Sequence, residues 1–134
     1  MSQQQNLATV EEIYAAVGIG DVDAILDRVT DDVDWAAEAA GTAAPWHGPR
    51  PGKAGVARFF ADLGSSIEIT EFTPHSFTVG ETDVHLLVDW AFTSIRTGRK
   101  VSMTMHHYWR LRGGEVEYFR GSEDTELTAP ALTA

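Results

Sequence analysis

The chain of 134 residues contains no cysteine, which excludes disulfide bonds and any mechanism that depends on a cysteine nucleophile. It also has no apolar run near the ~20 residues that a membrane-spanning helix needs. The first six residues are polar and lack the pattern of a signal peptide. These absences predict a cytoplasmic protein that has no membrane partner.

Basic residues are scarce as well. The chain has 10 Lys and Arg against 20 Asp and Glu, which gives a formal net charge of −10. Because nucleic acids are bound through basic surfaces, this balance argues against a nucleic-acid partner. The length and the 43% hydrophobic content predict one globular domain over residues 1–134 with a modest core. A small organic ligand or a protein partner is expected instead.

Helical periodicity is found in the first half of the chain. Apolar residues recur at helical spacing over about residues 6–18 and again around 56–64, and Asp21 suits the N-cap of a short helix between them. The Pro- and Gly-rich stretch 41–52 predicts a loop that could act as a lid, with His47 as a mobile surface side chain.

The last third of the chain predicts three antiparallel strands. Residues 83–95 and 101–112 alternate between apolar and polar side chains. Two-residue turns at Thr97-Gly98 and Gly113-Gly114 would superimpose their apolar faces. This register places one set of side chains on a common inner face: Val88, Trp90, Met103, Met105, His107, Trp109, Leu111, Val116, Tyr118, Arg120 and Asp124.

The order of helices, a short strand at 33–37, a helix and a long antiparallel meander predicts an α+β domain with helices on one face of the sheet. A sheet of this length curls and leaves a cavity between itself and the helices. We therefore expect the inner face to line a ligand pocket. The compact part should cover about residues 6–126, and residues 127–134 are expected to form an untethered tail.

The chain resembles the nuclear transport factor 2-like superfamily over about residues 6–126. The resemblance is carried by the segment from Tyr14 to Trp35, by the helix at 55–60 and by the closing hairpin that ends in Glu123-Asp124-Thr125. Within the superfamily, the chain is most similar to SnoaL-like polyketide cyclases and ketosteroid isomerase-like proteins. This implies a cone-shaped, curved antiparallel sheet packed against three N-terminal helices. It also implies a cofactor-independent acid/base enzyme of the isomerase, cyclase or dehydratase type that acts on a hydrophobic carbonyl-containing molecule.

Two polar residues on the inner face are the acid/base candidates. His107 matches the strand position at which ketosteroid isomerases place an oxyanion-stabilising aspartic acid, and an imidazole suits proton transfer near neutral pH. Asp124 matches the place of an acid/base aspartate in SnoaL-like cyclases, and apolar walls would raise its proton affinity. The alternatives are a structural core histidine that is hydrogen-bonded to Tyr14 or to backbone, and an aspartate that serves as a cap or a rim ion pair.

Other positions depart from the family pattern. Ala37 stands where ketosteroid isomerases carry their base, and Glu38 should point to the other face. Tyr14 is one residue away from the family's catalytic tyrosine, although we expect it to reach the cavity as a third catalytic candidate. Gly121 and Leu87 stand where epoxide-hydrolysing relatives need charged residues, which disfavours that activity. A non-catalytic ligand-binding or interaction protein of the same fold is therefore the alternative function.

Aromatic and long side chains are expected to bind the substrate, although several of them could be ordinary core. The set comprises Trp35, Trp46, Phe60, Trp90, Met103, Met105, Tyr118 and Arg120. The five histidines show no metal-ligand spacing, so no metal site is expected.

The outer sheet face predicts a homodimer. It would expose apolar side chains among polar ones, which favours a twofold interface. The expected interface residues are Leu87, Ala91, Thr104, Tyr108 and Phe119.

Overall fold

The structure is a computed structural model that describes residues 2–41 and 43–133. Thr42 of the predicted loop and Ala134 of the predicted tail lie outside these residues. The elements in chain order are α1 (Gln3–Ile19), α2 (Val22–Leu26), β1 (Val29–Glu38), β2 (Gly48–Pro49), α3 (Gly52–Ser66), β3 (Ile67–Val79), β4 (Asp83–Ser94), β5 (Lys100–Arg112), β6 (Glu115–Ser122) and α4 (Thr125–Leu132).

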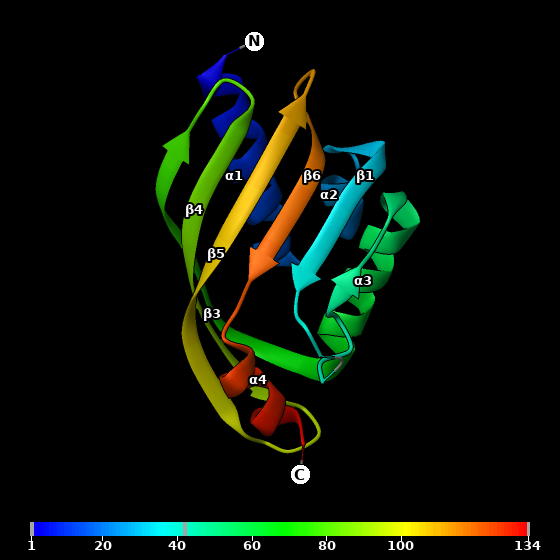
Figure 1. Ribbon diagram of the computed structural model, residues 1–134, viewed down its shortest axis with the longest axis vertical. Helices are drawn as coiled ribbons and strands as arrows, with labels where there is room; N and C mark the ends of the chain where they lie inside the picture. The colour runs from blue at the N-terminus through cyan, green and yellow to red at the C-terminus, as the bar shows by residue number, and fades with distance from the viewer. Residues whose placement is uncertain (1, 42, 134) are drawn as a thin grey trace.

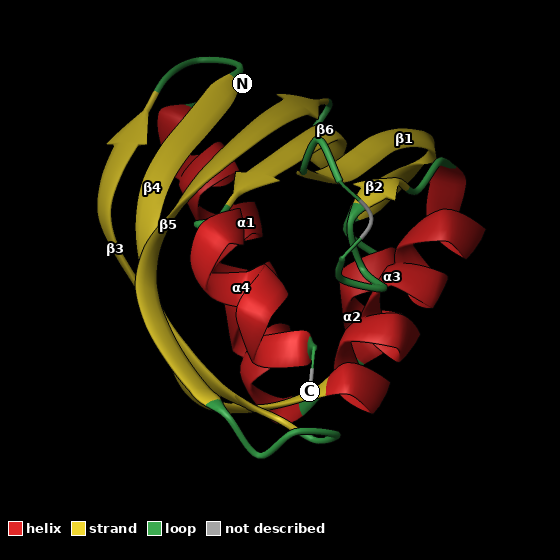
Figure 2. Ribbon diagram, turned by 60° about the horizontal axis from the view of Figure 1, so that its bottom comes forward, coloured by secondary structure: helices red, strands yellow, loops and turns green. Residues whose placement is uncertain are grey.

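The strands form one curved sheet in the order β2-β1-β6-β5-β4-β3 (Figure 1). The β1–β6 pair is parallel and the other pairs are antiparallel. The sheet curls around α1 and α4, and α2 and α3 lie on the open side of the curve (Figure 2). The expected α+β fold with a curved sheet and N-terminal helices is confirmed. Within the described residues, no helix has the length and apolarity that crossing a membrane requires.

The N-terminal helices form where the sequence predicted them. Helix α1 turns Val10, Ile13 and Tyr14 toward the sheet, and all three are buried. It ends at Gly20, whose left-handed φ of 71° is one that glycine adopts without strain. The Asp21 side chain accepts a hydrogen bond from the backbone N–H of Ala24, which confirms it as the cap of α2.

The hairpin of β4 and β5 has the predicted inner face but a different turn. His107 pairs with Leu86, two residues from the predicted partner Val88, because the connection is longer than the predicted Thr97-Gly98 turn. A shift of two residues leaves every side chain on the same face of a strand. His107 is therefore buried and His106 exposed, as predicted.

The hairpin of β5 and β6 begins as predicted and then changes register. Gly113 and Gly114 have φ values of 59° and 83°, as a tight two-residue turn requires, and Arg112 pairs with Glu115. A β-bulge follows, because Leu111 pairs with Val116 while Arg110 pairs with Tyr118, so that Glu117 is an extra residue in β6.

The bulge exchanges the two faces of β6 beyond Glu117. Phe119, predicted on the outer face, is buried beside Trp109 on the inner face. Tyr118 and Arg120, predicted on the inner face, lie on the outer one. There the Arg120 guanidinium carbon lies 4.1 Å from the centre of the Tyr118 ring. The prediction for these three residues was wrong, because one inserted residue inverts the alternation.

The predicted untethered tail instead forms helix α4. The Asp124 side chain accepts a hydrogen bond from the backbone N–H of Glu126 at the start of this helix, and Asp124 is exposed. The C-terminal half of α4 is held by Thr97, whose hydroxyl donates to the Ala131 carbonyl, and by Arg99, which donates to the Pro130 carbonyl. Asp124 is thus a helix cap and not an inner-face residue.

Candidate active site in the concave pocket

A pocket with almost entirely apolar walls lies between the concave face of the sheet and helices α1 and α3. Apart from Glu123, whose side chain is buried, the lining residues that are half-buried or exposed lie on α1, α3 and β3, so the mouth is at this side. The centre of a water-sized sphere can reach about 60 Å³ of its interior. The lining comprises Ile13, Tyr14, Val17, Trp35, Ala37, Trp46, Phe59, Phe60, Leu63, Ile69, Phe72, Trp90, Met105, His107, Trp109, Phe119, Gly121 and Glu123.

Three polar side chains form a buried hydrogen-bond chain at one end of the pocket. The indole Nε1–H of Trp109 donates to the Tyr14 hydroxyl oxygen over 3.0 Å. That hydroxyl lies 2.5 Å from Nδ1 of His107. The indole can only donate, so the Tyr14 oxygen accepts from it. A buried hydroxyl hydrogen without a partner is costly, and among the described residues the acceptor within reach of this hydroxyl is Nδ1 of His107, so the hydrogen points there. This assigns the hydrogen of the neutral imidazole to Nε2.

Burial determines the charge state of this chain. It lowers the pKa of His107 from 6.5 to about 3, although the nearby negative charge of Glu123 opposes the shift. Burial also raises the pKa of the Tyr14 hydroxyl far above its ordinary value of 10.0, although the hydrogen bond from Trp109 opposes this. At neutral pH, both His107 and Tyr14 are therefore uncharged, and His107 can act as a hydrogen-bond donor through Nε2.

The position of Gly121 leaves room for the imidazole. Gly121 pairs with His107 across β5 and β6. An added Cβ at Gly121 would lie only 3.3 Å from Nε2 of His107. Gly121 also lines the pocket, so the absence of a side chain keeps Nε2 beside open space.

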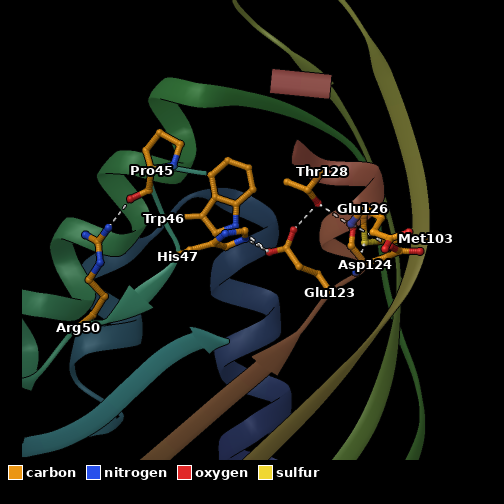
Figure 3. A network of polar contacts seen from close by, with 9 residues as sticks. All are labelled: Pro45, Trp46, His47, Arg50, Met103, Glu123, Asp124, Glu126 and Thr128. Carbon is orange, nitrogen blue, oxygen red and sulfur yellow. Dashed lines mark hydrogen bonds and ion pairs between the residues drawn. The ribbon is translucent and has the colours of Figure 1, made fainter. Parts of the chain in front are cut away.

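A second polar cluster surrounds Glu123, which also lines the pocket (Figure 3). Glu123 Oε1 accepts hydrogen bonds from Nε1 of Trp46 and Nε2 of His47, each over 2.9 Å. The Thr128 hydroxyl on α4 donates to Oε2 over 2.5 Å. The His47 and Glu123 side chains are only 3% and 4% exposed. The loop before β2 and helix α4 are thus tied together through one carboxylate.

These hydrogen bonds keep Glu123 ionised. Burial by itself would raise its pKa, but the hydrogen bonds from His47, Thr128 and Trp46 outweigh burial and lower it below 4.5. A carboxylate has about four acceptor sites, so three donors leave one free, on Oε2. Glu123 is therefore the pocket carboxylate that is able to accept a further hydrogen.

The structure brings most of the predicted site residues together. Tyr14 and His107 line the pocket, as do the predicted substrate-binding residues Trp35, Trp46, Phe60, Trp90 and Met105. Their chemical roles remain predictions. Ala37 lines the pocket as well, whereas Glu38 points outward and pairs with Arg120 over 3.0 Å.

Four predicted site residues lie elsewhere. Asp124 caps α4, and Tyr118 and Arg120 are on the outer face for the reasons given above. Met103 packs against the core without lining the pocket, and its sulfur accepts a hydrogen bond from the backbone N–H of Asp124.

The sequence interpretation missed Glu123 and His47. Glu123 is in phase with Phe119 and Gly121, so a prediction that included the bulge would have placed it inside. The prediction of a mobile surface His47 was wrong, because the imidazole is buried against Glu123.

The pocket offers a hydrogen-bond donor at His107, a carboxylate at Glu123 and largely apolar walls. This arrangement suits a hydrophobic molecule that carries a carbonyl oxygen. The described part of the chain contains no group of three or more His, Asp or Glu side chains arranged to hold a metal ion.

The sequence matches a family model described as a SnoaL-like domain over residues 10–119. The chain belongs to the SnoaL-like family. Its curved sheet and N-terminal helices agree with this assignment. No curated protein sequence matches the chain significantly.

Solved structures show the same fold over the whole SnoaL-like chain. A nuclear transport factor 2-like protein of unknown function from Burkholderia pseudomallei is 25% identical, with a TM-score of 0.89 and full coverage of both chains. A proposed polyketide cyclase from Xanthomonas campestris is 16% identical, with a TM-score of 0.78 and 98% of each chain covered. An LEH-like epoxide hydrolase from Mycobacterium tuberculosis is 16% identical, with a TM-score of 0.73 and coverage of 96% of this chain and 90% of that one. The fold of this SnoaL-like protein is thus shared by proteins whose descriptions name different activities.

Proposed function

We propose that this SnoaL-like protein is a cofactor-independent acid/base enzyme that acts on a hydrophobic carbonyl-containing small molecule. The observation that carries the proposal is the Trp109–Tyr14–His107 chain, which leaves the Nε2–H of His107 as a fixed donor in a largely apolar pocket. A donor in such surroundings stabilises the negative charge that develops on a carbonyl oxygen when the adjacent carbon loses a proton. Isomerisation, cyclisation and dehydration of carbonyl compounds share this step.

Each polar residue then has a distinct role. His107 donates from Nε2 to the carbonyl oxygen of the substrate. Tyr14 acts through His107, because its hydroxyl fixes the tautomer, and it is a positioning residue. Glu123 accepts the proton through the free site on Oε2. Its Coulombic influence on His107 supports a common cavity for the two groups.

The size of the pocket restricts the substrate. Its reachable interior of about 60 Å³ is smaller than the ~150 Å³ cavity that accommodates benzene in another protein. A ligand with even one ring therefore requires the apolar side chains at the mouth to change rotamer. We take single-ring ketones as the first substrates to test.

The second candidate is a non-catalytic ligand-binding protein. It is favoured by the three hydrogen bonds that already occupy Glu123, and by Ala37 at the position of the base in related isomerases. Such a protein would bind ketones without accelerating their proton exchange.

Deuterium exchange into 4-alkylcyclohexanones, followed by NMR, tests the hypothesis that the protein is an enzyme. We expect the wild type to accelerate exchange next to the carbonyl and His107→Asn to lower the rate by roughly 10²-fold. Asparagine places an oxygen near the position of Nδ1 and can still accept from Tyr14, so the fold should persist. The substitution removes the donor at Nε2.

Two adjacent acids supply a matched control for the same measurement. Glu123→Gln should lower the exchange rate at least tenfold, whereas Asp124→Asn should leave it within about twofold, because Asp124 is exposed and asparagine also caps helices. Exchange no faster than in buffer, combined with retained ketone binding, would instead establish a non-catalytic ligand-binding protein.

We also propose that the outer sheet face mediates a homodimer. Leu87, Ala91 and Tyr108 are half-buried on this face beside the exposed Thr104, whereas Phe119 takes no part because it is inside. Sedimentation at micromolar concentration should show a dimer, and Leu87→Glu should shift it toward monomer. A wild type that sediments only as a monomer would contradict the proposal.

A further inference from the structure

Trp46 closes one end of the pocket, and its position is fixed by a polar contact. The indole is only 1% exposed and lies edge-on to Trp90 and Phe92, with ring centroids 6.2 Å apart in each pair. Its Nε1–H donates to Glu123. Trp46 thus bridges from β4 to the end of β6, across the concave face.

The loop that carries Trp46 is also anchored. Arg50 donates to the Pro45 carbonyl (Figure 3). It also forms an ion pair with Asp62 on α3 over 2.7 Å. The backbone N–H of Arg50 donates to the Trp35 carbonyl over 2.7 Å. His47, next to Trp46, is bound to the same carboxylate as the indole. Both neighbours of the loop, α3 and the β6–α4 junction, therefore hold it in place.

The side chains at the mouth of the pocket are held less firmly than Trp46. Phe60, Leu63, Ile69 and Phe72 are half-buried or exposed, have no polar atoms in their side chains and are held by packing alone. They can change rotamer at small cost when a ligand enters. Trp46 can move only if its hydrogen bond to Glu123 breaks inside the protein, where an unpaired donor is costly.

The distance from His107 to the level of Trp46 sets a length. Gly121 pairs with His107, and Glu123, which accepts from Trp46, lies two residues further along the chain. Two residues of an extended strand span about 7 Å, and the indole reaches from this level to Trp90, whose partner Met103 lies about 14 Å from His107 along β5. A ligand whose carbonyl oxygen meets His107 therefore extends past Glu123 toward the indole.

We propose that Trp46, held by Glu123, sets the upper length of the ligands that the pocket accepts. The inference rests on the proposed function, because it requires a ligand whose carbonyl oxygen is held at His107. The width of the pocket adapts through the mouth side chains, whereas its length is fixed at Trp46.

The test measures affinities of the full chain for 4-alkylcyclohexanones from methyl to heptyl by calorimetry. In the wild type, affinity should rise about fourfold per methylene while the chain is buried and should then drop at least tenfold at one chain length. In Trp46→Ala, this limit should move by about two or more methylenes, because the indole leaves space that a chain can fill. Trp46→Phe removes less volume and should move the limit by a smaller step.

Phe59→Leu provides a matched control. Phe59 is a buried aromatic residue of the lining on α3, and its ring packs edge-on to Trp35 and Phe60. Its replacement should change the affinity for all chain lengths without moving the limit.

The outcomes separate this inference from the proposed function. A wild type that binds no member of the series overturns both. A wild type that binds, with a limit that Trp46→Ala and Trp46→Phe leave unchanged, overturns only the role of Trp46. If Trp46→Ala does not fold, the limit in Trp46→Phe decides by itself, since phenylalanine keeps an aromatic ring against Trp90 and Phe92.

Discussion

Acidification from pH 7 to pH 4 should lower the free energy of unfolding of the wild type by about 3 kcal/mol more than that of His107→Asn. Burial lowers the pKa of His107 in the folded protein to about 3, whereas the unfolded chain has the ordinary value of 6.5. Below pH 6.5 the unfolded state binds a proton that the folded state does not. The stabilisation from neutral His107 is thus fully present above pH 6.5 and is lost as the pH falls toward 3.

Urea denaturation at pH 7, 6, 5 and 4 measures this difference. Other titrating groups are common to both proteins and cancel when the two curves are subtracted. The lowered pKa of Glu123 acts only below its ordinary value of 4.5, so the difference between pH 7 and pH 5 reports on His107.

An exposed histidine gives the matched control. His85 lies exposed on β4, so His85→Asn should follow the pH dependence of the wild type. Parallel curves for the wild type and His107→Asn would show that His107 is not buried in its neutral form.

Replacing Glu123 with alanine should lower the free energy of unfolding by about 3 to 5 kcal/mol at neutral pH. The substitution removes the acceptor of three donors, on Trp46, His47 and Thr128, and each unsatisfied buried donor costs about 1–3 kcal/mol. Water can enter and repay part of this cost, so the three contributions do not add in full. Thermal or urea unfolding provides the measurement.

The neighbouring acid again serves for comparison. Asp124→Asn keeps a capping side chain on α4 and should change the free energy of unfolding by less than about 0.5 kcal/mol. A loss below about 1 kcal/mol in Glu123→Ala would mean that the carboxylate does not hold the loop and α4 together.

The fold could be predicted because the apolar pattern of β4 and β5 repeats with a period of two. The error in the first turn shifted the pairing of His107 by two residues, from Val88 to Leu86, and left the side chain on the same face. The second turn was predicted correctly from Gly113 and Gly114. An error of an even number of residues therefore does not change which residues face the pocket.

The wrong predictions for the site residues come from the one-residue shift of register in β6. Val116 and Phe119 are both buried, although strict alternation would place them on opposite faces. The sequence holds a signal of this, since Phe119 and Gly121 make a less polar inner face than Tyr118 and Arg120. The prediction missed this signal because it continued the alternation of inner and outer residues from Val116 through the whole strand.

The Glu123 cluster could not be predicted from local sequence. Its members Trp46 and Glu123 are 77 residues apart and come from a loop and a strand end. Neither segment has a repeating pattern of apolar and polar residues that would indicate where its side chains point. Contacts of this kind depend on how the sheet curls, which no pattern within a short window of sequence encodes.

The bulge at Glu117 also bears on how this pocket can diverge in evolution. Deletion of Glu117 would remove the bulge and leave the faces of β6 unchanged, because Tyr118 would still pair with Arg110 and Phe119 with Trp109. Loss of the bulge with Glu117 kept in regular pairing would instead move every later residue by one position, so that Tyr118 and Arg120 enter the cavity and Phe119 leaves it. A change of local strand pairing, with no change in chain length, would thereby replace an apolar wall by a phenol and a guanidinium, a change of ligand chemistry that stepwise substitution reaches only through several intermediates.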